Sequence, residues 1–178
     1  MFPGRVCRNK GVGVITRELV EAIRKAYALD WGGMHGMAHW LRVRENGLRL
    51  AELTGADRQV VKLFAFIHDA KRLTDWPDPE HGRRAAEFAE TLRGSLIVLP
   101  DRAFRWLVYA CEWHSDGLTE APPTVQTCWD ADRLDLGRIG VRPDPRFLCT
   151  AAAKDGAMIE WAFTKSQQEP ENSTWLDR

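Results

Sequence analysis

The order of apolar and polar residues predicts a chain made almost entirely of helices. Residues 15–29 and 33–53 carry apolar side chains every three or four positions, the spacing of an amphipathic helix. Residues 60–72 (VVKLFAFIHDAKR) are apolar on nearly every side, as expected of the central, buried helix of a domain. Four later segments have helical spacing as well: 79–92, 100–114, 128–139 and 144–163. No period-two pattern typical of strands is present, so we expect an all-α bundle of about six helices.

The length of 178 residues fits a single domain. We expect the helical domain to span residues 15–165. Residues 1–14, with one proline and three glycines, are expected to be irregular. Residues 166–178 are rich in Ser, Gln and Glu and are expected to form a disordered polar tail.

Charge and composition exclude several classes of partner. The chain has 25 basic and 25 acidic residues, so it lacks a global field that would attract nucleic acid or an anionic membrane. Its apolar runs are far shorter than the ~20 residues that span a bilayer, and its N-terminus lacks a signal-peptide layout. The four cysteines show no C-x-x-C spacing, which favours buried thiols in a reducing cytoplasm. The eight tryptophans are interpreted as core residues.

Histidine and aspartate residues interrupt the apolar faces of several predicted helices. His68 and Asp69 follow the apolar run of 60–72, and a buried carboxylate requires a charge partner or a metal. His39 shares a helix face with Val43, Leu50 and Leu53, which directs its side chain toward the core.

Two further histidines and one aspartate occupy similar positions. Asp78 and Pro79 are a favourable start for a helix whose first turn contains His81. His114 ends the apolar face of the helix at 100–114. Asp132 has apolar helical neighbours and is expected to point inward.

The two aspartates flanking Asp132 receive different interpretations. Asp130 lies on the opposite side of the predicted helix, so we expect it to face solvent or to cap the helix start. Asp135 lies one turn beyond Asp132 and could support a ligand.

Each of these residues also has a purely structural explanation. A single histidine such as His35 or His81 on an apolar side is more often a hydrogen-bonded core residue than a ligand. Asp132 could form a buried ion pair with Arg42 or Arg72. One divalent metal, however, explains five inward-facing residues together, and imidazole and carboxylate ligands suit zinc, iron, nickel or manganese. These five residues are His39, His68, Asp69, His114 and Asp132.

The order of these motifs resembles the HD-domain superfamily of metal-dependent phosphohydrolases. The matching pieces are HWLRV, the HD pair, HG, WHSDG and DADRLD, which together cover residues 33–140. The resemblance implies that His39, His68, Asp69 and Asp132 hold one metal. In the binuclear members two further histidines hold a second metal, and the matching positions are His81 and His114. Many members have Lys three residues after the Asp, where this chain has Arg72.

This resemblance implies a hydrolase acting on a small phosphorylated substrate, with a nucleotide favoured. One or two divalent ions (Mn, Fe, Co, Ni, Mg or Zn) would activate a water molecule for attack on phosphorus. Asp69 is expected to bridge two ions. Arg72, with Lys71 and Arg42 as lesser candidates, is expected to neutralise the phosphate. His35 and Asp135 are expected to orient the metal ligands without binding the metal themselves.

Two other classes of function remain open. Some relatives use the same six-residue pattern with two irons as oxygenases. A helical binding module that keeps the metal without turnover is the third hypothesis. The oligomeric state is also open.

Overall fold

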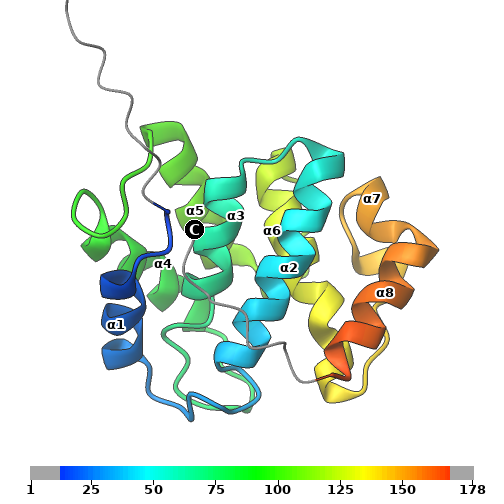
Figure 1. Ribbon diagram of the computed structural model, residues 1–178, viewed down its shortest axis with the longest axis horizontal. Helices are drawn as coiled ribbons and strands as arrows, with labels where there is room; N and C mark the ends of the chain where they lie inside the picture. Colours follow the sequence, from blue (N-terminus) through cyan, green and yellow to red (C-terminus); the bar gives the residue numbers. More distant parts are fainter. Residues whose placement is uncertain (1–12, 169–178) are drawn as a thin grey trace, which may run out of the picture.

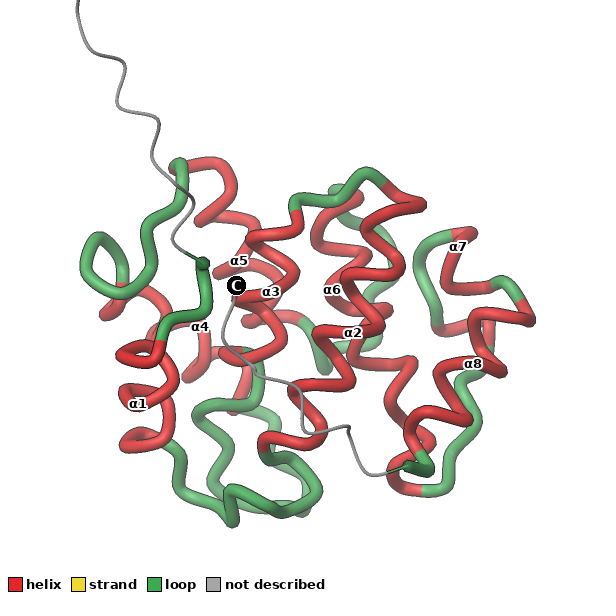
Figure 2. The backbone as a smooth tube through the Cα atoms, in the orientation of Figure 1, coloured by secondary structure: helices red, strands yellow, loops and turns green. Residues whose placement is uncertain are grey.

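The computed structural model describes residues 13–168, which form eight α-helices and two short 3-10 helices (Figures 1 and 2). These are α1 (Arg17–Ala26), α2 (Met37–Thr54), α3 (Arg58–Ile67), α4 (His81–Leu92), α5 (Asp101–Trp113), α6 (Pro123–Arg133), η1 (Leu134–Ile139), η2 (Pro145–Phe147), α7 (Ala151–Lys154) and α8 (Gly156–Ser166). Residues 13–168 contain no strand, so the predicted all-α class is confirmed. The irregular segment predicted at 1–14 and the tail predicted at 166–178 lie mostly outside the described residues, although α8 extends to Ser166.

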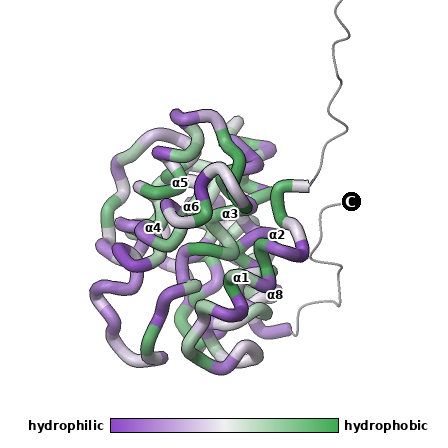
Figure 3. The backbone as a smooth tube through the Cα atoms, turned by 90° about the vertical axis from the view of Figure 1, so that its left-hand side faces the viewer, coloured by the Kyte–Doolittle hydropathy of each residue, from purple (hydrophilic) through white to green (hydrophobic). Residues whose placement is uncertain are grey.

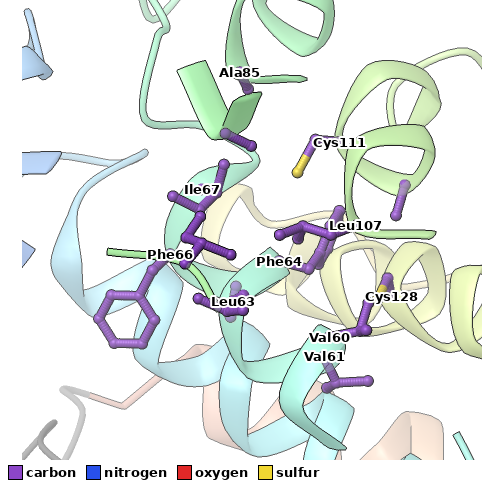
Figure 4. Close-up of a cluster of buried hydrophobic side chains, with 14 of the residues drawn as sticks. Val60, Val61, Leu63, Phe64, Phe66, Ile67, Ala85, Leu107, Cys111 and Cys128 are labelled. Carbon is purple, nitrogen blue, oxygen red and sulfur yellow. The ribbon is translucent and has the colours of Figure 1, made fainter. Parts of the chain in front are cut away.

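Helix α3 is the centre of the bundle, as its apolar sequence predicts. Its residues from Val60 to Ile67 are buried except Lys62, and the helix packs against α2, α5 and α6. Figure 4 shows α3 side chains meeting Leu107 and Cys111 of α5 and Cys128 of α6. In Figure 3 the segments around α3 are mostly hydrophobic, whereas hydrophilic positions dominate the outer turns.

Close helix packing brings α2 against α3. A Cβ atom added at Gly47 would lie 2.5 Å from Cγ1 of Val61 and 3.2 Å from Cβ of Ala131, so only glycine permits this approach. The contact places the N-terminal half of α2 beside the C-terminal end of α3. His39 is therefore carried toward His68 and Asp69.

The structure corrects the predicted start of α4. The helix begins at His81, and Asp78 does not cap it. Both carboxylate oxygens of Asp78 instead accept hydrogen bonds from the Arg84 guanidinium, and one also accepts from the Leu73 amide. Burial would raise the pKa of Asp78, but these hydrogen bonds hold it below its usual value. Asp78 thus fastens the 73–79 loop to α4.

The predicted role of Asp130 is also wrong. This carboxylate is fully buried and accepts hydrogen bonds from the backbone amides of Cys149 and Thr150 and from the Thr150 hydroxyl. It holds the segment before α7 against α6. A prediction from one helix could not include these donors, which come from about twenty residues further along the chain.

Several helix boundaries differ from the predicted ones. Helix α3 ends at Ile67 rather than 72, and His68 and Asp69 lie in the turn that follows. The predicted helix at 128–139 starts earlier, at Pro123, and changes to 3-10 geometry at Leu134. The predicted helix at 144–163 is divided into η2, α7 and α8.

Within residues 13–168, no helix combines the length and the apolar character required to cross a bilayer.

Candidate metal centre

Five helices bring the predicted ligands to one region of the bundle (Figure 1). His39 comes from the first turn of α2, and Asp132 from the last turn of α6. The remaining four residues lie where helices begin or end: His68 and Asp69 directly after α3, His81 at the start of α4, and His114 directly after α5.

Four of these side chains form a first cluster. Nε2 of His39 lies 3.1 Å from Nε2 of His68, 3.7 Å from Oδ2 of Asp69 and 3.4 Å from Oδ1 of Asp132. Nε2 of His68 lies 3.7 Å from each of the same two carboxylate oxygens. Two atoms that each bind one divalent ion at about 2.1 Å are roughly 3.0–3.4 Å apart. The measured separations are close to this range.

A second cluster shares Asp69 with the first. Its other oxygen, Oδ1, lies 3.3 Å from Nε2 of His81 and 3.7 Å from Nε2 of His114, and these two nitrogens are 2.8 Å apart. Among residues 13–168, no group is hydrogen-bonded to this buried Oδ1. A buried carboxylate oxygen without a donor is costly, and a cation between Asp69, His81 and His114 would satisfy it.

The opposite nitrogen of each imidazole is already engaged. Nδ1 of His68, His81 and His114 contacts the backbone carbonyl of Phe64, Asp78 and Cys111, respectively. These carbonyls can only accept, so each Nδ1 carries the proton and each Nε2 presents a lone pair to its cluster. Lone pairs at 2.8–3.1 Å repel unless a proton or a metal ion lies between them. The donor set therefore fits divalent metal.

Electrostatics keep most of the donors in their ligating form. Burial lowers the pKa of His68 from 6.5 to about 3 and also lowers the pKa of His81. Burial would raise the pKa of Asp69 and Asp132, but the surrounding histidines hold both below the usual value. Burial would lower the pKa of His114, yet the Asp69 and Asp132 carboxylates raise it. Of His68, His81 and His114, the last is thus the one that most readily takes up a proton in the metal-free protein.

Two residues predicted to orient ligands contact them directly. Asp135 is buried, and its Oδ2 lies 2.7 Å from Nδ1 of His39. Nδ1 of His35 lies 3.0 Å from Oδ2 of Asp69. Asp135 thus fixes the orientation of the His39 ring, and His35 fixes the orientation of the Asp69 carboxylate.

The three predicted phosphate-binding residues occupy three different environments. Arg72 lies at the second cluster, with Nη1 3.3 Å from Nε2 of His81 and 3.6 Å from Oδ1 of Asp69. Lys71 points away from both clusters, because its ammonium group contacts the Ala26 carbonyl and lies over the Phe88 ring.

Arg42 does not join the ligands either. Its Nε donates to Oδ1 of Asp135 at 2.7 Å, on the side of the His39 ring that faces away from His68. The expectation that Arg42 and Lys71 contact a phosphate beside Arg72 stays a prediction, and in this arrangement the Nε of Arg42 and the ammonium group of Lys71 both face away from the two clusters.

The first cluster is accessible to solvent beside Asp132. The Asp132 side chain is 18% exposed, whereas each histidine of the two clusters and Asp69 is at most 5% exposed. Asp132 is therefore the member of the first cluster that is most exposed to solvent.

One exposed aromatic residue near the clusters was missed. Trp76 is 79% exposed in the loop after α3, so its interpretation as core is wrong. Arg72 fixes this loop by donating from Nε to the Thr74 carbonyl and from Nη2 to the Trp76 carbonyl. The position of Trp76 in a segment with two prolines and two aspartates at 73–79 was the available signal, since such a segment is a loop.

Comparisons with known proteins agree with the fold. No protein-family model and no curated protein matches the chain. A crystal structure of a predicted HD superfamily hydrolase from an uncultured Thermotogales bacterium is similar, with a TM-score of 0.62 and 25% sequence identity. The match covers 83% of this chain and 84% of that one. The similarity and the two His/Asp clusters fit a metal-dependent hydrolase. The protein has the all-α fold of the HD-domain superfamily.

Proposed function

We propose that the protein hydrolyses a phosphoester or phosphoanhydride bond of a small molecule with one or two divalent ions. The observation that carries this proposal is the convergence of four imidazole Nε2 atoms on the two oxygens of a single carboxylate, Asp69. His39, His68, Asp69 and Asp132 would hold one ion, and Asp69, His81 and His114 a second. Ions bound there would acidify a water molecule and neutralise charge on the phosphate oxygens.

The protein's own groups perform the remaining steps. Asp135 and the backbone carbonyls behind the other histidines keep each Nε2 deprotonated and directed inward. Nη1 of Arg72 lies 3.6 Å from Asp69 Oδ1, and this guanidinium can donate two parallel hydrogen bonds to a phosphoryl group. Its interaction strengthens as negative charge builds on the phosphate oxygens, which lowers the barrier.

Trp76 supports a nucleotide as the substrate. Its ring is exposed, while its backbone is tied to Arg72, the proposed phosphate-binding residue. A base stacked on this indole would lie near a phosphate held by Arg72, and such stacking contributes about 1–3 kcal/mol per base. The protein is proposed to act in the cytoplasm, since Cys111 and Cys128 are buried free thiols.

A phosphate-release screen tests this function. Chelated protein is reconstituted separately with Mn, Fe, Co, Ni, Mg and Zn and assayed with nucleotides and with p-nitrophenyl phosphate. We expect metal-dependent release of phosphate, and Asp69→Ala and Asp132→Ala should abolish it. Trp76→Ala should raise the KM for nucleotides but not the KM for p-nitrophenyl phosphate. Absence of hydrolysis with every metal would contradict the proposal and favour a non-catalytic module.

A diiron oxygenase is the second candidate. The specific observation in its favour is the complete His81–His114 pair facing Asp69, which could hold a second iron. Oxygen consumption by iron-loaded protein, without phosphate release, would identify this activity.

A further inference from the structure

A cavity of about 340 Å³ lies where α2, η1 and α8 meet, apart from the two His/Asp clusters. His39 separates the two regions: its Nε2 faces the first cluster, while its Nδ1 faces Asp135, which is bound by Arg42. The volume falls in the lower part of the range for small-ligand sites, roughly 300–1,000 Å³. The residues that line the cavity include Gly33, Ala38, Arg42, Arg138, Ser166 and Gln167.

Arg42 brings unused hydrogen-bond donors into this cavity. The residue is only 9% exposed, and its Nε donates to Asp135. Among residues 13–168, no acceptor is hydrogen-bonded to either terminal nitrogen of this guanidinium. A buried guanidinium is stable when its remaining donors are satisfied, and an anion in the cavity would satisfy them.

Arg138 supplies a second guanidinium. Its Nη1 donates to the backbone carbonyl of Asp135 at 3.0 Å, whereas its buried Nε has no hydrogen-bond partner in the described part of the chain. Arg42 therefore contacts the side chain of Asp135, and Arg138 contacts its backbone carbonyl. Both arginines line the same cavity. Their combined charge exceeds the single negative charge of Asp135.

The N-terminus of α2 adds a favourable dipole. This 18-residue helix has Gly36 at its N-cap and no side chain capping it. The Met37 amide donates to the Trp31 carbonyl, but within the described residues the amide of Ala38 has no acceptor. The positive end of the helix dipole and the free amide favour an anion here.

The polar groups around the cavity are partly engaged by other residues. The Ser166 hydroxyl donates to the Phe163 carbonyl, and the Gln167 side-chain amide donates to the Gly137 carbonyl. The two oxygens of Asp135 are bound by His39 and Arg42. The two guanidinium groups of Arg42 and Arg138 therefore leave an excess of positive charge at the cavity.

We propose that this cavity is a binding site for a phosphate group, distinct from the metal centre. The planar donor forks of Arg42 and Arg138 match the oxygens of phosphate, which accepts several hydrogen bonds at once. The phosphate could belong to free inorganic phosphate or to a nucleotide.

Titration of chelated protein with inorganic phosphate by calorimetry tests the proposal. Arg138→Gln should weaken binding about tenfold or more, because it removes a charged partner. Arg146→Gln is the matched control: it makes the same change in charge at an exposed residue paired with Asp144, and binding should not change. Arg138→Lys, which retains charge but loses the planar fork, should also bind more weakly and serves as the test if Arg138→Gln does not fold.

A second comparison separates the cavity from the metal centre. Arg72→Ala should leave phosphate binding to chelated protein unchanged. If Arg72→Ala removes binding and Arg138→Gln does not, or if wild-type protein shows no saturable binding at millimolar phosphate, the proposal is overturned. Tighter binding of adenosine monophosphate than of inorganic phosphate would identify the ligand as a nucleotide, and the reverse order would identify the free ion; either order supports the site.

Discussion

His39 and Asp135 are 96 positions apart in the chain, yet Nδ1 of the imidazole and Oδ2 of the carboxylate are 2.7 Å apart. The carboxylate is an acceptor, so it fixes the proton of His39 on Nδ1 and leaves Nε2 free. Arg42 holds the other oxygen of Asp135 at 2.7 Å. The orientation and tautomer of a proposed ligand are thus set by residues that touch no metal themselves.

Asp135→Asn should lower the affinity for divalent metal by about 10–100-fold, the usual effect of losing such a partner. The new amide can donate to Nδ1 and so favours the tautomer with the proton on Nε2, which cannot bind metal. Calorimetric titration with Mn²⁺ measures the change. Asp144→Asn is a suitable control, since Asp144 pairs with exposed Arg146. Equal affinities in wild type and Asp135→Asn would show that this contact does not tune the site.

Arg72 and Lys71 are adjacent basic residues with different predicted effects on catalysis. Arg72→Ala should reduce kcat/KM on a phosphorylated substrate by about 10²–10³ while metal content stays constant, since one transition-state donor is lost. Lys71→Ala should leave kcat/KM unchanged because its ammonium group faces Ala26 and Phe88. Steady-state kinetics of the two variants, with metal content measured in parallel, provides the check. An equal loss of kcat/KM in the two variants would show that Arg72 does not stabilise the transition state more than Lys71 does.

Gly82 should be intolerant of any side chain. A Cβ atom there would lie 2.5 Å from the Glu112 carbonyl oxygen and 2.8 Å from that of Cys111, which is the acceptor for Nδ1 of His114. Gly82→Ala should therefore cost about 1–3 kcal/mol of unfolding free energy and displace both His81 and His114. Urea unfolding followed by tryptophan fluorescence measures the loss.

Gly156 provides the matched control for that experiment, because a Cβ atom there meets nothing within 4 Å. Gly156→Ala should change stability by no more than about 0.5 kcal/mol. A Gly82→Ala variant as stable as Gly156→Ala would contradict the close contact between α4 and α5.

The stability of chelated protein should fall on acidification. Burial lowers the pKa of His68 to about 3 and also lowers that of His81, so below about pH 6.5 the unfolded chain binds more protons than the folded one. Their stabilising contribution is present above the unfolded value and is lost as the pH falls toward the folded value. Below about pH 4 the lowered pKa values of Asp69 and Asp132 act in the same direction.

The pKa shift of His114 makes stability depend on pH in the opposite direction. Its pKa is raised in the folded protein, so its contribution is complete below about pH 6.5 and is lost as the pH rises through the raised value. We therefore expect maximal stability of chelated protein near pH 6.5. Urea unfolding at intervals between pH 4.5 and 8 measures this profile, and a flat profile would contradict the proposed protonation states.

The inward positions of His39 and His68 could be predicted from the sequence because each side chain continues the apolar face of its helix. His39 and His68 interrupt apolar faces, and such interruptions require an interior partner. The pairing itself could not be derived from spacing, since the contacts of His81 with His114 and of His39 with Asp135 depend on how α2, α4, α5 and η1 pack. The order of motifs, through the family resemblance, supplied the grouping of His81 with His114 but not the contact of His39 with Asp135.

The error at Asp130 has a clear physical origin. Asp130 was expected to face solvent or to cap the helix start because its own helix offered no partner, but backbone donors of Cys149 and Thr150 bind it. Lys71 was expected near the site because it precedes Arg72, and its ammonium group contacts the Ala26 carbonyl of α1. Partners distant in the chain decide the environment of such charged side chains.

Anomalous diffraction from a crystal soaked in Mn²⁺ tests the metal centre most directly. We predict an anomalous peak at bonding distance from Nε2 of His39, Nε2 of His68, Oδ2 of Asp69 and Oδ1 of Asp132, and its loss in Asp69→Ala crystals. A second peak beside Oδ1 of Asp69, between His81 and His114, would identify a binuclear site. No peak among these atoms in wild-type crystals, or a peak that persists unchanged in Asp69→Ala, would contradict the assignment.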